Sequence, residues 1–295
     1  MILDGNWQDA LEPIAKKNFN VGLKEIPAEK SMLFDVVKSD KLTETYLEIG
    51  DVGSMEEFNG SVAYDDISQG YKMTVTAKEM AKGIKIQRRF VRTDQLDIVK
   101  SLPKMLGLAA RRRIALDVFY GYNNAFNSSI TTLDTLSLCN SAHTSTNGGS
   151  NQGNSGSTAF SGVSVEATRL LMKKFLSNTD QRFEVKPDML IVPPDLEEAA
   201  YELTASSGKV DTANNNKNFH QGKWKVLVSD WLEDTNNWFM VDSDLLKQFA
   251  VWNDVDSIDF AQSEDFDGIA AKYRAYMFYG FGFRDWRFTY GHAVS

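Results

Sequence analysis

The chain has 295 residues, of which 42% are hydrophobic and 24% are charged, and this length supports one large domain or two ordinary ones with a substantial core. Its formal net charge of −8 argues against a dedicated duplex-DNA binder, and its single cysteine, Cys139, excludes an intrachain disulfide framework and suits a reducing cytosol. The N-terminus has no basic region followed by an apolar run, and no stretch approaches the ~20 apolar residues of a membrane helix, so we expect neither a signal peptide nor a membrane partner.

The charge is strongly polarised along the chain. Residues 72–113 carry twelve Lys or Arg against three acidic residues, whereas residues 228–267 carry eleven acidic residues against Lys247 alone. Blocks of opposite charge act on association and partner choice rather than on the fold. The sequence therefore predicts a molecule that can recognise a copy of itself.

The first 60 residues are mixed in character. Residues 7–19 have the pattern of an amphipathic helix, but Pro13 and Pro27 interrupt this region. We therefore expect an extended arm rather than a domain.

Residues 71–91 have the alternation of a two-stranded β-ribbon. Met73 and Val75 alternate with polar residues in the first half, Ile84 and Ile86 do so in the second, and Gly83 would suit the turn between them. A two-stranded ribbon is marginal in water, so its apolar face needs either its own domain or a neighbouring molecule.

A long helix is predicted over residues 103–126. Ser101 would cap it and Pro103 would lie in its first turn. At ~1.5 Å per residue it would exceed ~30 Å, which is long enough to be the spine of a domain. Its apolar face is formed by Met105, Leu106, Ala109, Leu116, Phe119 and Tyr120.

The remaining sequence predicts an α+β region followed by further strands. A polar, Gly-rich loop at 145–158 precedes a helix at 165–176, a buried strand at 188–192 and a helix that Asp195 and Glu198 would cap. A second polar loop at 206–222 and strands at 223–228 and 238–241 follow. Residues 273–290 hold nine aromatic side chains, and Gly280 and Gly282 indicate a bulge or a close backbone approach there.

No catalytic or cofactor-binding set emerges from the motifs. His143 follows Cys139 by four residues without the further ligands of a zinc site, and the glycines at 148–156 lack the Lys-Ser/Thr of a phosphate loop. No nucleophile elbow is present, and the acidic residues at 254–259 lack the glycine of a calcium loop. Arg111, Arg112 and Arg113 would point about 100° apart on a helix and cannot form one flat patch. We therefore expect no enzyme, metal or cofactor.

The order of arm, basic ribbon, spine helix, α+β insertion and C-terminal strands resembles that of tailed-phage major capsid proteins with the HK97-like fold. Four segments resemble the Mu-like phage major head subunit family in particular. They are residues 53–58 (GSMEEF), 136–143 (LSLCNSAH), 187–197 (PDMLIVPPDLE) and 282–287 (GFRDWR).

This resemblance implies an α+β fold with five parts. Residues 1–60 would be an N-terminal arm, and residues 61–93 an extended β-hairpin loop that lies over an adjacent subunit. Residues 94–134 would form the peripheral domain with the spine helix, completed by the C-terminal strands of residues 246–295. Residues 135–245 would form the axial domain, whose polar loop at 206–222 is a candidate to reach a capsomer symmetry axis.

The resemblance also implies a function. The protein would be the major capsid protein of a tailed bacteriophage, assembling through hexamers and pentamers into an icosahedral shell around the DNA genome. It would act in the virion and assemble in the host cytoplasm with a separate scaffolding protein and a portal, and its inner face would contact packaged DNA without sequence specificity. No Lys–Asn pair for covalent crosslinking is indicated.

The opposed charge blocks supply the candidate contacts between subunits. We expect the basic residues to reach a neighbour and the acidic ones to receive them, with salt-sensitive assembly as the result. The basic candidates are Lys78, Lys82, Lys85, Arg88, Arg89 and Arg92, and the acidic candidates are Asp254, Asp256, Asp259, Glu264 and Asp265.

Three alternatives remain open from the sequence. One is a nanocompartment shell protein of the same fold, which would enclose enzyme cargo rather than a genome. Another is a small-molecule-binding protein or hydrolase that uses His143 or His220 beside acidic residues in a pocket. The last is a nucleic-acid-binding module that uses the basic block at 72–113.

Overall fold

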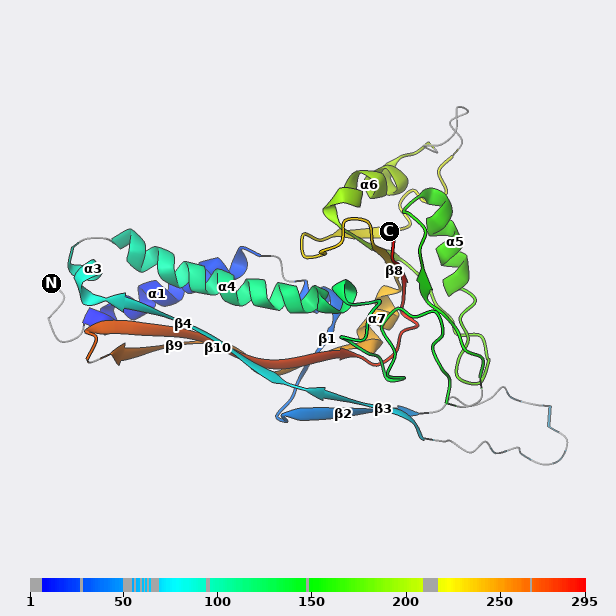
Figure 1. Cartoon of the computed structure of the whole chain (residues 1–295), viewed down its shortest axis with the longest axis horizontal. Helices are drawn as coiled ribbons and strands as arrows, with labels where there is room; N and C mark the ends of the chain where they lie inside the picture. The colour runs from blue at the N-terminus through cyan, green and yellow to red at the C-terminus, as the bar shows by residue number, and fades with distance from the viewer. Residues whose placement is uncertain are drawn as a thin grey trace.

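The computed structural model of the chain shows an elongated unit of helices along a sheet, joined at one end to a second unit, with a hairpin projecting below (Figure 1). The structure describes residues 7–26, 29–49, 55, 57–58, 60, 62, 64, 69–93, 96–146, 149–208, 217–265 and 267–295. Helices and largely antiparallel strands in mixed order confirm the α+β class.

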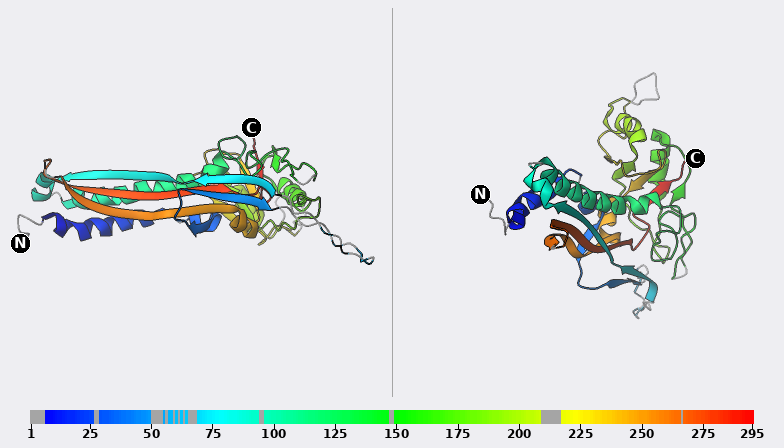
Figure 2. Two further views of the ribbon diagram at one scale, coloured as in Figure 1. Left: turned by 90° about the horizontal axis from the view of Figure 1, so that it is seen from below. Right: turned by 60° about the vertical axis from the view of Figure 1, so that its left-hand side comes forward.

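The elongated unit is built on a four-stranded sheet. In spatial order its strands are β1 (Asp35–Lys38), β9 (Ala250–Asp265), β10 (Ala270–Phe283) and β4 (Lys78–Gln87). Strands β9 and β10 form a long antiparallel hairpin, β4 runs antiparallel to β10, and β1 runs parallel to β9. One face of this sheet is covered by helices, and the other is open in the view from below (Figure 2, left).

Two helices cover the sheet, the spine helix α4 (Leu96–Asn123) and the N-terminal helix α1 (Trp7–Lys24). The spine begins earlier than predicted, so Pro103 lies inside it. The expectation of an extended arm at residues 7–19 is wrong, because burial of Leu11 and Phe19 offsets the weakness at Pro13.

Glycines allow α1 and α4 to touch through their backbones. A Cβ at Gly22 would overlap the carbonyl oxygen of Lys104, and one at Gly107 would overlap that of Phe19. Only glycine permits this approach, so the N-terminal helix belongs to the fold of the elongated unit.

The predicted ribbon has different strand partners. Strand β3 (Gln69–Thr76) pairs with β2 (Thr43–Ile49), whereas β4 pairs with β10 in the main sheet. Gly83 is not in a turn but lies opposite Arg274 in the middle of β4, and residues 88–92 form helix α3 (Arg88–Arg92) rather than strand. Alternation predicts a strand correctly but carries no information about its partner. Of the predicted hairpin loop at 61–93, residues 61, 63 and 65–68 lie outside the described set.

The second unit contains a five-stranded sheet. In spatial order its strands are β5 (Ser155–Gly156), β11 (Thr289–His292), β8 (Trp238–Val241), β6 (Met189–Val192) and β7 (Lys225–Val228). The predicted strands at 188–192, 223–228 and 238–241 are confirmed within one or two residues. Strand β11 lies here rather than with β10, so the C-terminal segment expected as one body divides between the two sheets. Much of the polar loop expected at 206–222 falls on residues 209–216, outside the described set.

The helices of the five-stranded unit are short. Helix α5 (Gly162–Met172) is capped by Ser161. A 3-10 turn, η1 (Pro194–Leu196), precedes helix α6 (Glu197–Ala205), whose N-cap is Leu196, so the predicted capping by Asp195 and Glu198 is wrong. Helix α7 (Ser243–Phe249) connects β8 to β9. One core cluster, with Phe119, Ile191 and Trp252 among its members, extends across both sheets, and the short helix α2 (Lys30–Leu33) adds Leu33.

Candidate functional site: an assembly surface

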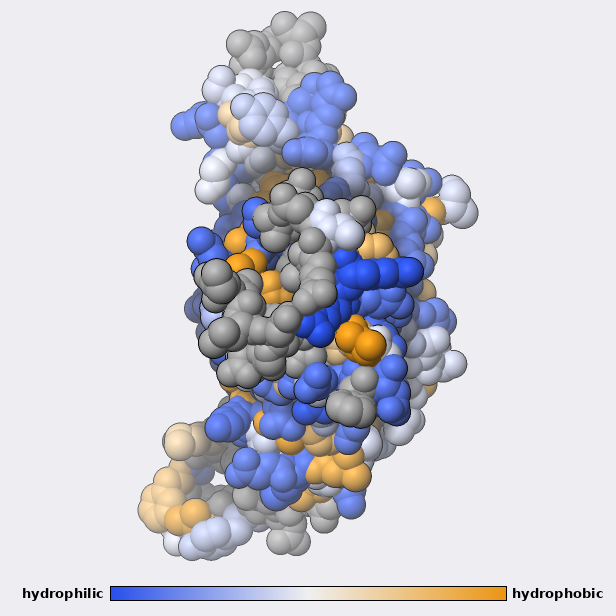
Figure 3. Space-filling model, turned by 90° about the vertical axis from the view of Figure 1, so that its left-hand side faces the viewer, coloured by the Kyte–Doolittle hydropathy of each residue, from blue (hydrophilic) through white to orange (hydrophobic). Residues whose placement is uncertain are grey.

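The predicted contact residues lie on three neighbouring elements of the elongated unit. The lysines are on β4, the arginines follow on α3, and the acidic residues are on β9. Strands β4 and β9 flank β10 in one sheet, so the two charge blocks run side by side at roughly two strand spacings, about 9.5 Å. The surface at the end of the molecule that carries α3 is mostly hydrophilic, with scattered apolar patches (Figure 3).

Three of the candidates have partners within the chain. Asp265 accepts from Lys85 at 2.5 Å and lies 3.3 Å from Lys272, and the Lys85 ammonium lowers the pKa of Asp265 below its usual value. Asp254 pairs with Lys30 at 3.1 Å. For Asp254, Asp265 and Lys85 the structure therefore provides partners in the same subunit, where the sequence suggested partners on a neighbour.

Other candidates remain open to a neighbour. Within the described residues, no ion pair engages Lys78, Lys82, Asp256, Asp259 or Glu264, and all five are exposed. Asp259 lies opposite Tyr276 on the open face of the sheet, whereas Lys82 lies opposite Ala275, whose side chain faces the helices. Lys82 and Asp259 thus lie on different faces, whereas Glu264, opposite the buried Ala271, shares the helix-covered face with Lys82.

The structure describes the arginine candidates on α3 less completely than the lysine and acidic candidates. Arg89 lies over the Phe90 ring at 4.9 Å, Arg88 is half-buried, and the side chain of Arg92 is outside the described set. Two basic residues on the spine helix also have acidic partners within the chain, because Lys104 pairs with Glu25 and Arg113 pairs with Asp117. Arg111 donates to the carbonyl oxygen of Ile26 at 3.1 Å, so Arg111 and Arg113 point to different partners.

The projecting hairpin β2–β3 crosses the open face of the sheet at two glycines. A Cβ at Gly280 would lie 3.0 Å from Val75, and one at Gly282 would lie 3.1 Å from both Met73 and Val75. This confirms the close backbone approach predicted from Gly280 and Gly282. At the crossing, the Tyr46 hydroxyl donates to Asn253 at 2.7 Å.

The hairpin is also held by the five-stranded unit. Asn178 donates to the Glu48 carboxylate, and its own amide oxygen accepts from Arg287 at 2.6 Å. The hydroxyls of Tyr71 and Thr144 are 2.8 Å apart. We call Glu48, Tyr71, Thr144, Asn178 and Arg287 the hairpin anchor. No signal in the sequence indicated this set, because Glu48 and Asn178 are 130 residues apart.

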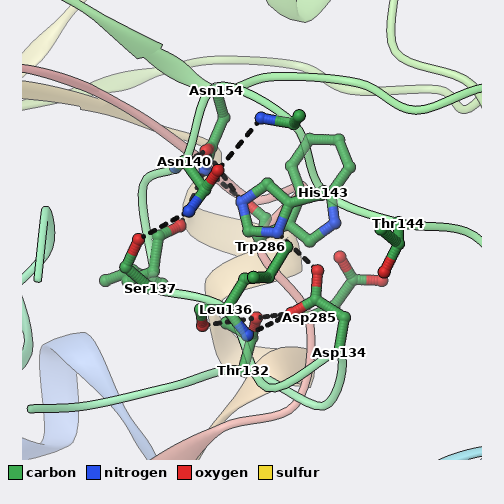
Figure 4. A network of polar contacts seen from close by, with 12 residues as sticks. Thr132, Asp134, Leu136, Ser137, Asn140, His143, Thr144, Asn154, Asp285 and Trp286 are labelled. Atoms are coloured by element: carbon green, nitrogen blue, oxygen red, sulfur yellow. Dashed lines mark hydrogen bonds and ion pairs between the residues drawn. The ribbon is translucent and has the colours of Figure 1, made fainter. Parts of the chain in front are cut away.

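His143, one of the two histidines that the hydrolase alternative would use, is part of a closed polar network (Figure 4). Its Nδ1 lies 2.6 Å from Asp134, its Nε2 lies 3.0 Å from the amide oxygen of Asn154, and its ring stacks on Trp286 at 4.4 Å. Asn154 is oriented by its own donations to the carbonyls of Leu138 and other residues, so its oxygen must face the ring. Both ring nitrogens of His143 therefore have partners within the chain, and neither is left for a substrate.

Hydrogen bonds within this network stabilise the charged form of the Asp134 carboxylate. Burial raises the pKa of Asp134, but hydrogen bonds from His143 and Thr132 outweigh it and hold that pKa below the usual value. His143 itself is 2% exposed. The network connects the loop that follows α4 to the C-terminal segment, which is a structural task.

The other two histidines are also buried against tryptophans. His292 stacks on Trp238 at 4.2 Å between the hydroxyls of Thr158 and Thr168, and burial lowers its pKa to about 4. His220 accepts from the indole N–H of Trp224 at 3.1 Å, and burial lowers its pKa as well. Each histidine thus serves packing.

Neither hollow in the elongated unit resembles a reaction site. One of about 330 Å³ lies between α4 and the sheet, lined mainly by Ala and Met, and one of about 550 Å³ lies around Gly83; no histidine lines either. Over the described ranges, no cluster of three or more His, Cys, Asp or Glu has metal-binding geometry. In that same part of the chain, no helix combines the length and apolar character that a bilayer crossing requires.

Comparison with known proteins shows which protein family shares this architecture. A family model for phage capsid proteins matches residues 70–291. The Mu-like prophage FluMu major head subunit of Haemophilus influenzae is 33% identical over 95 residues, which are 32% of this chain and 30% of that protein. The alignment therefore spans less than a third of the relative's length.

Solved structures show the same fold at low identity. The capsid of bacteriophage JBD30 matches with a TM-score of 0.61 and 15% identity, covering 79% of this chain and 100% of that one. The virus-like particle from Pyrococcus furiosus matches with a TM-score of 0.55 and 9% identity, covering 95% and 98%. Since the family model covers most of the chain and solved capsid subunits share its architecture, the chain belongs to the phage capsid protein family and has the HK97-like fold of phage major capsid proteins.

Proposed function

We propose that this protein is the major capsid subunit of a tailed bacteriophage and self-assembles through hexamers and pentamers into an icosahedral shell around the DNA genome. The observation that carries the proposal is a set of exposed apolar side chains in the segment that joins β2 to β3. Between β2 and β3, the described apolar side chains are exposed to 101% (Met55), 73% (Phe58), 60% (Val62) and 90% (Tyr64). Apolar side chains presented on a projection need a surface from another molecule.

The family match supports a copy of the same chain as that molecule and a genome as the cargo. It favours the phage shell over a nanocompartment with enzyme cargo. The closed environments of His143 and His220 support a structural role without enzymatic activity. Assembly in the host cytoplasm, a separate scaffolding protein, a portal and sequence-independent contact with packaged DNA belong to the same proposal.

The proposal also covers the contact residues and the bounds of the extended loop. The extended loop is proposed to be the hairpin β2–β3 rather than residues 61–93. The exposed residues Asp256, Asp259 and Glu264 and the lysines Lys78 and Lys82 are proposed to contact neighbouring subunits, because their charges have no ion-pair partner in the described chain.

Electron microscopy and sedimentation of the purified protein, with and without its scaffolding protein, test this function. We expect closed shells or capsomers for the wild type and loss of both for Phe58→Ser combined with Tyr64→Ser. Met105→Ser serves as a control, since Met105 is also 62% exposed but lies on the spine helix. A wild type that stays monomeric under every condition would refute the proposal.

A further inference from the structure

Helix α5 carries an apolar stripe that its own chain does not cover. Val165 and Met172 on its inner side are fully buried, whereas Val163, Leu170 and Leu171 are 76%, 47% and 44% exposed. These three positions share one face of the helix because of its 3.6-residue period.

The stripe ends in positive charge. Lys173 and Lys174 follow Met172, the last residue of α5, and are exposed. Among the described residues, neither lysine takes part in an ion pair. Helix α5 therefore presents a surface that is apolar at one end and basic at the other.

Helix α6 presents the opposite combination. Tyr201 is 70% exposed at its centre, Glu198 lies one turn before it on the same face, and the exposed Glu202 follows it about 100° around the helix. No ion pair in the described chain engages either glutamate. An exposed aromatic side chain with two free carboxylates on one side of it matches an apolar stripe that ends in two free ammonium groups.

The two helices lie close together on one face of the five-stranded sheet, where both contribute to the same core cluster, and their exposed side chains face away from that core (Figure 1). Stacking α5 on α5 across a two-fold axis would bring Lys173 and Lys174 toward like charges. A head-to-tail contact avoids this, because the basic surface of one copy meets the acidic surface of the next. Such heterologous contacts form closed rings when the rotation between copies closes.

We infer that α5 of one subunit docks on α6 of the next, with Tyr201 against Leu170 and Leu171. This inference rests on the proposed self-assembly and adds the lateral contact and its direction. The apolar and aromatic side chains supply the buried centre, and the pairs between Glu198 or Glu202 and Lys173 or Lys174 set register and direction.

Helix dipoles alone do not account for these features. They favour acidic residues in the first turn of α6 and lysines after the last turn of α5. They give no reason for Val163, Leu170, Leu171 and Tyr201 to remain exposed, whereas a docked neighbour does.

Charge reversal with rescue tests the contact in the full-length chain. Lys173→Glu with Lys174→Glu, and separately Glu198→Lys with Glu202→Lys, should each reduce the assembled fraction in sedimentation at least about tenfold. The chain that carries all four changes should assemble again, because each copy then offers the swapped charges to its neighbour. Arg182→Glu with Lys186→Glu is the matched control and should assemble as the wild type does.

Tyr201→Ser provides a second variant that cannot disturb the subunit's own core, and it should also weaken assembly. Circular dichroism and melting of the unassembled variants report folding separately. If wild-type shells form and the reversed pairs assemble equally well, or if the fourfold variant is not rescued, the α5–α6 contact is wrong while the proposed function stands. If the wild type itself never assembles, the proposed function fails first.

Discussion

The two units of this molecule use ionisable side chains in different ways. In the elongated unit, pairs such as Lys85–Asp265 lie at the surface of a sheet whose strands are held by long backbone ladders. In the five-stranded unit, the strands are short, and buried polar groups such as His143, Asn154 and His292 connect the loops to the sheet. We therefore expect the first unit to respond to salt at its surface and the second to respond to pH and to single buried substitutions.

The largest effect is expected at His143. His143→Ala would leave Asp134 buried with one fewer donor and Trp286 without its stacked partner. Removing one member of a buried pair costs about 3–5 kcal/mol of unfolding free energy. Urea denaturation of the unassembled subunit measures this loss. A change below about 1 kcal/mol would mean that the network does not support the fold.

Acid should destabilise the five-stranded unit through His292. Because its folded pKa is about 4 and the ordinary value is 6.5, the unfolded chain binds the extra proton between these values. The contribution of His292 to the free energy of unfolding is therefore fully present above pH 6.5. It falls by up to about 3 kcal/mol as the pH is lowered toward 4. The lowered pKa of His220 acts in the same direction, whereas that of Asp134 acts only below its own ordinary value of 3.8.

Denaturation monitored between pH 7 and 4 by tryptophan fluorescence measures this effect. His292→Gln keeps hydrogen bonding to Thr158 or Thr168 within reach and should flatten the pH dependence. An unchanged slope in that variant would assign the acid sensitivity to other groups.

A smaller effect is expected where the hairpin crosses the elongated unit. Gly280→Val would place side-chain atoms against Val75 and Ala77, and overpacking of this kind costs about 1–3 kcal/mol. Hydrogen exchange should rise in β2 and β3 but not in the β9–β10 ladder. Ala261→Val, on the same sheet, is the control. Equal protection of the hairpin in both variants would show that the crossing does not hold it.

The smallest effect on the subunit is expected at the surface pair of the elongated unit. Lys85→Ala removes an exposed partner of Asp265, and exposed pairs contribute little because water and salt screen them. The melting temperature of the unassembled subunit should change little at moderate salt. A large loss of melting temperature would remove the contrast drawn between the two units.

Local patterns predicted the elements of the elongated unit better than their arrangement. Alternation identified the strands around Val75 and Ile86, and helical periodicity identified the spine. In the acidic stretch the residue pattern indicates only charge, and strands there were expected from the family resemblance alone. The stretch forms most of the sixteen-residue strand β9, whose exposed aspartates hide the alternation. Of the candidate site, the sequence indicated the glycine crossing and the charge blocks but neither the hairpin anchor nor the ion pairs of Asp254 and Asp265.

By itself, the sequence determined the α+β composition, the buried strands such as β6 and β8, the need of glycine at positions 280 and 282, and the resemblance to capsid proteins. These depend on neighbouring residues and on burial, which local patterns record. Only the tertiary structure decided that β4 pairs with β10, that β11 returns to the five-stranded sheet, and that His143 meets Asp134, Asn154 and Trp286. Such pairings join residues far apart in the chain, so they are set by packing of the whole molecule and not by any local pattern.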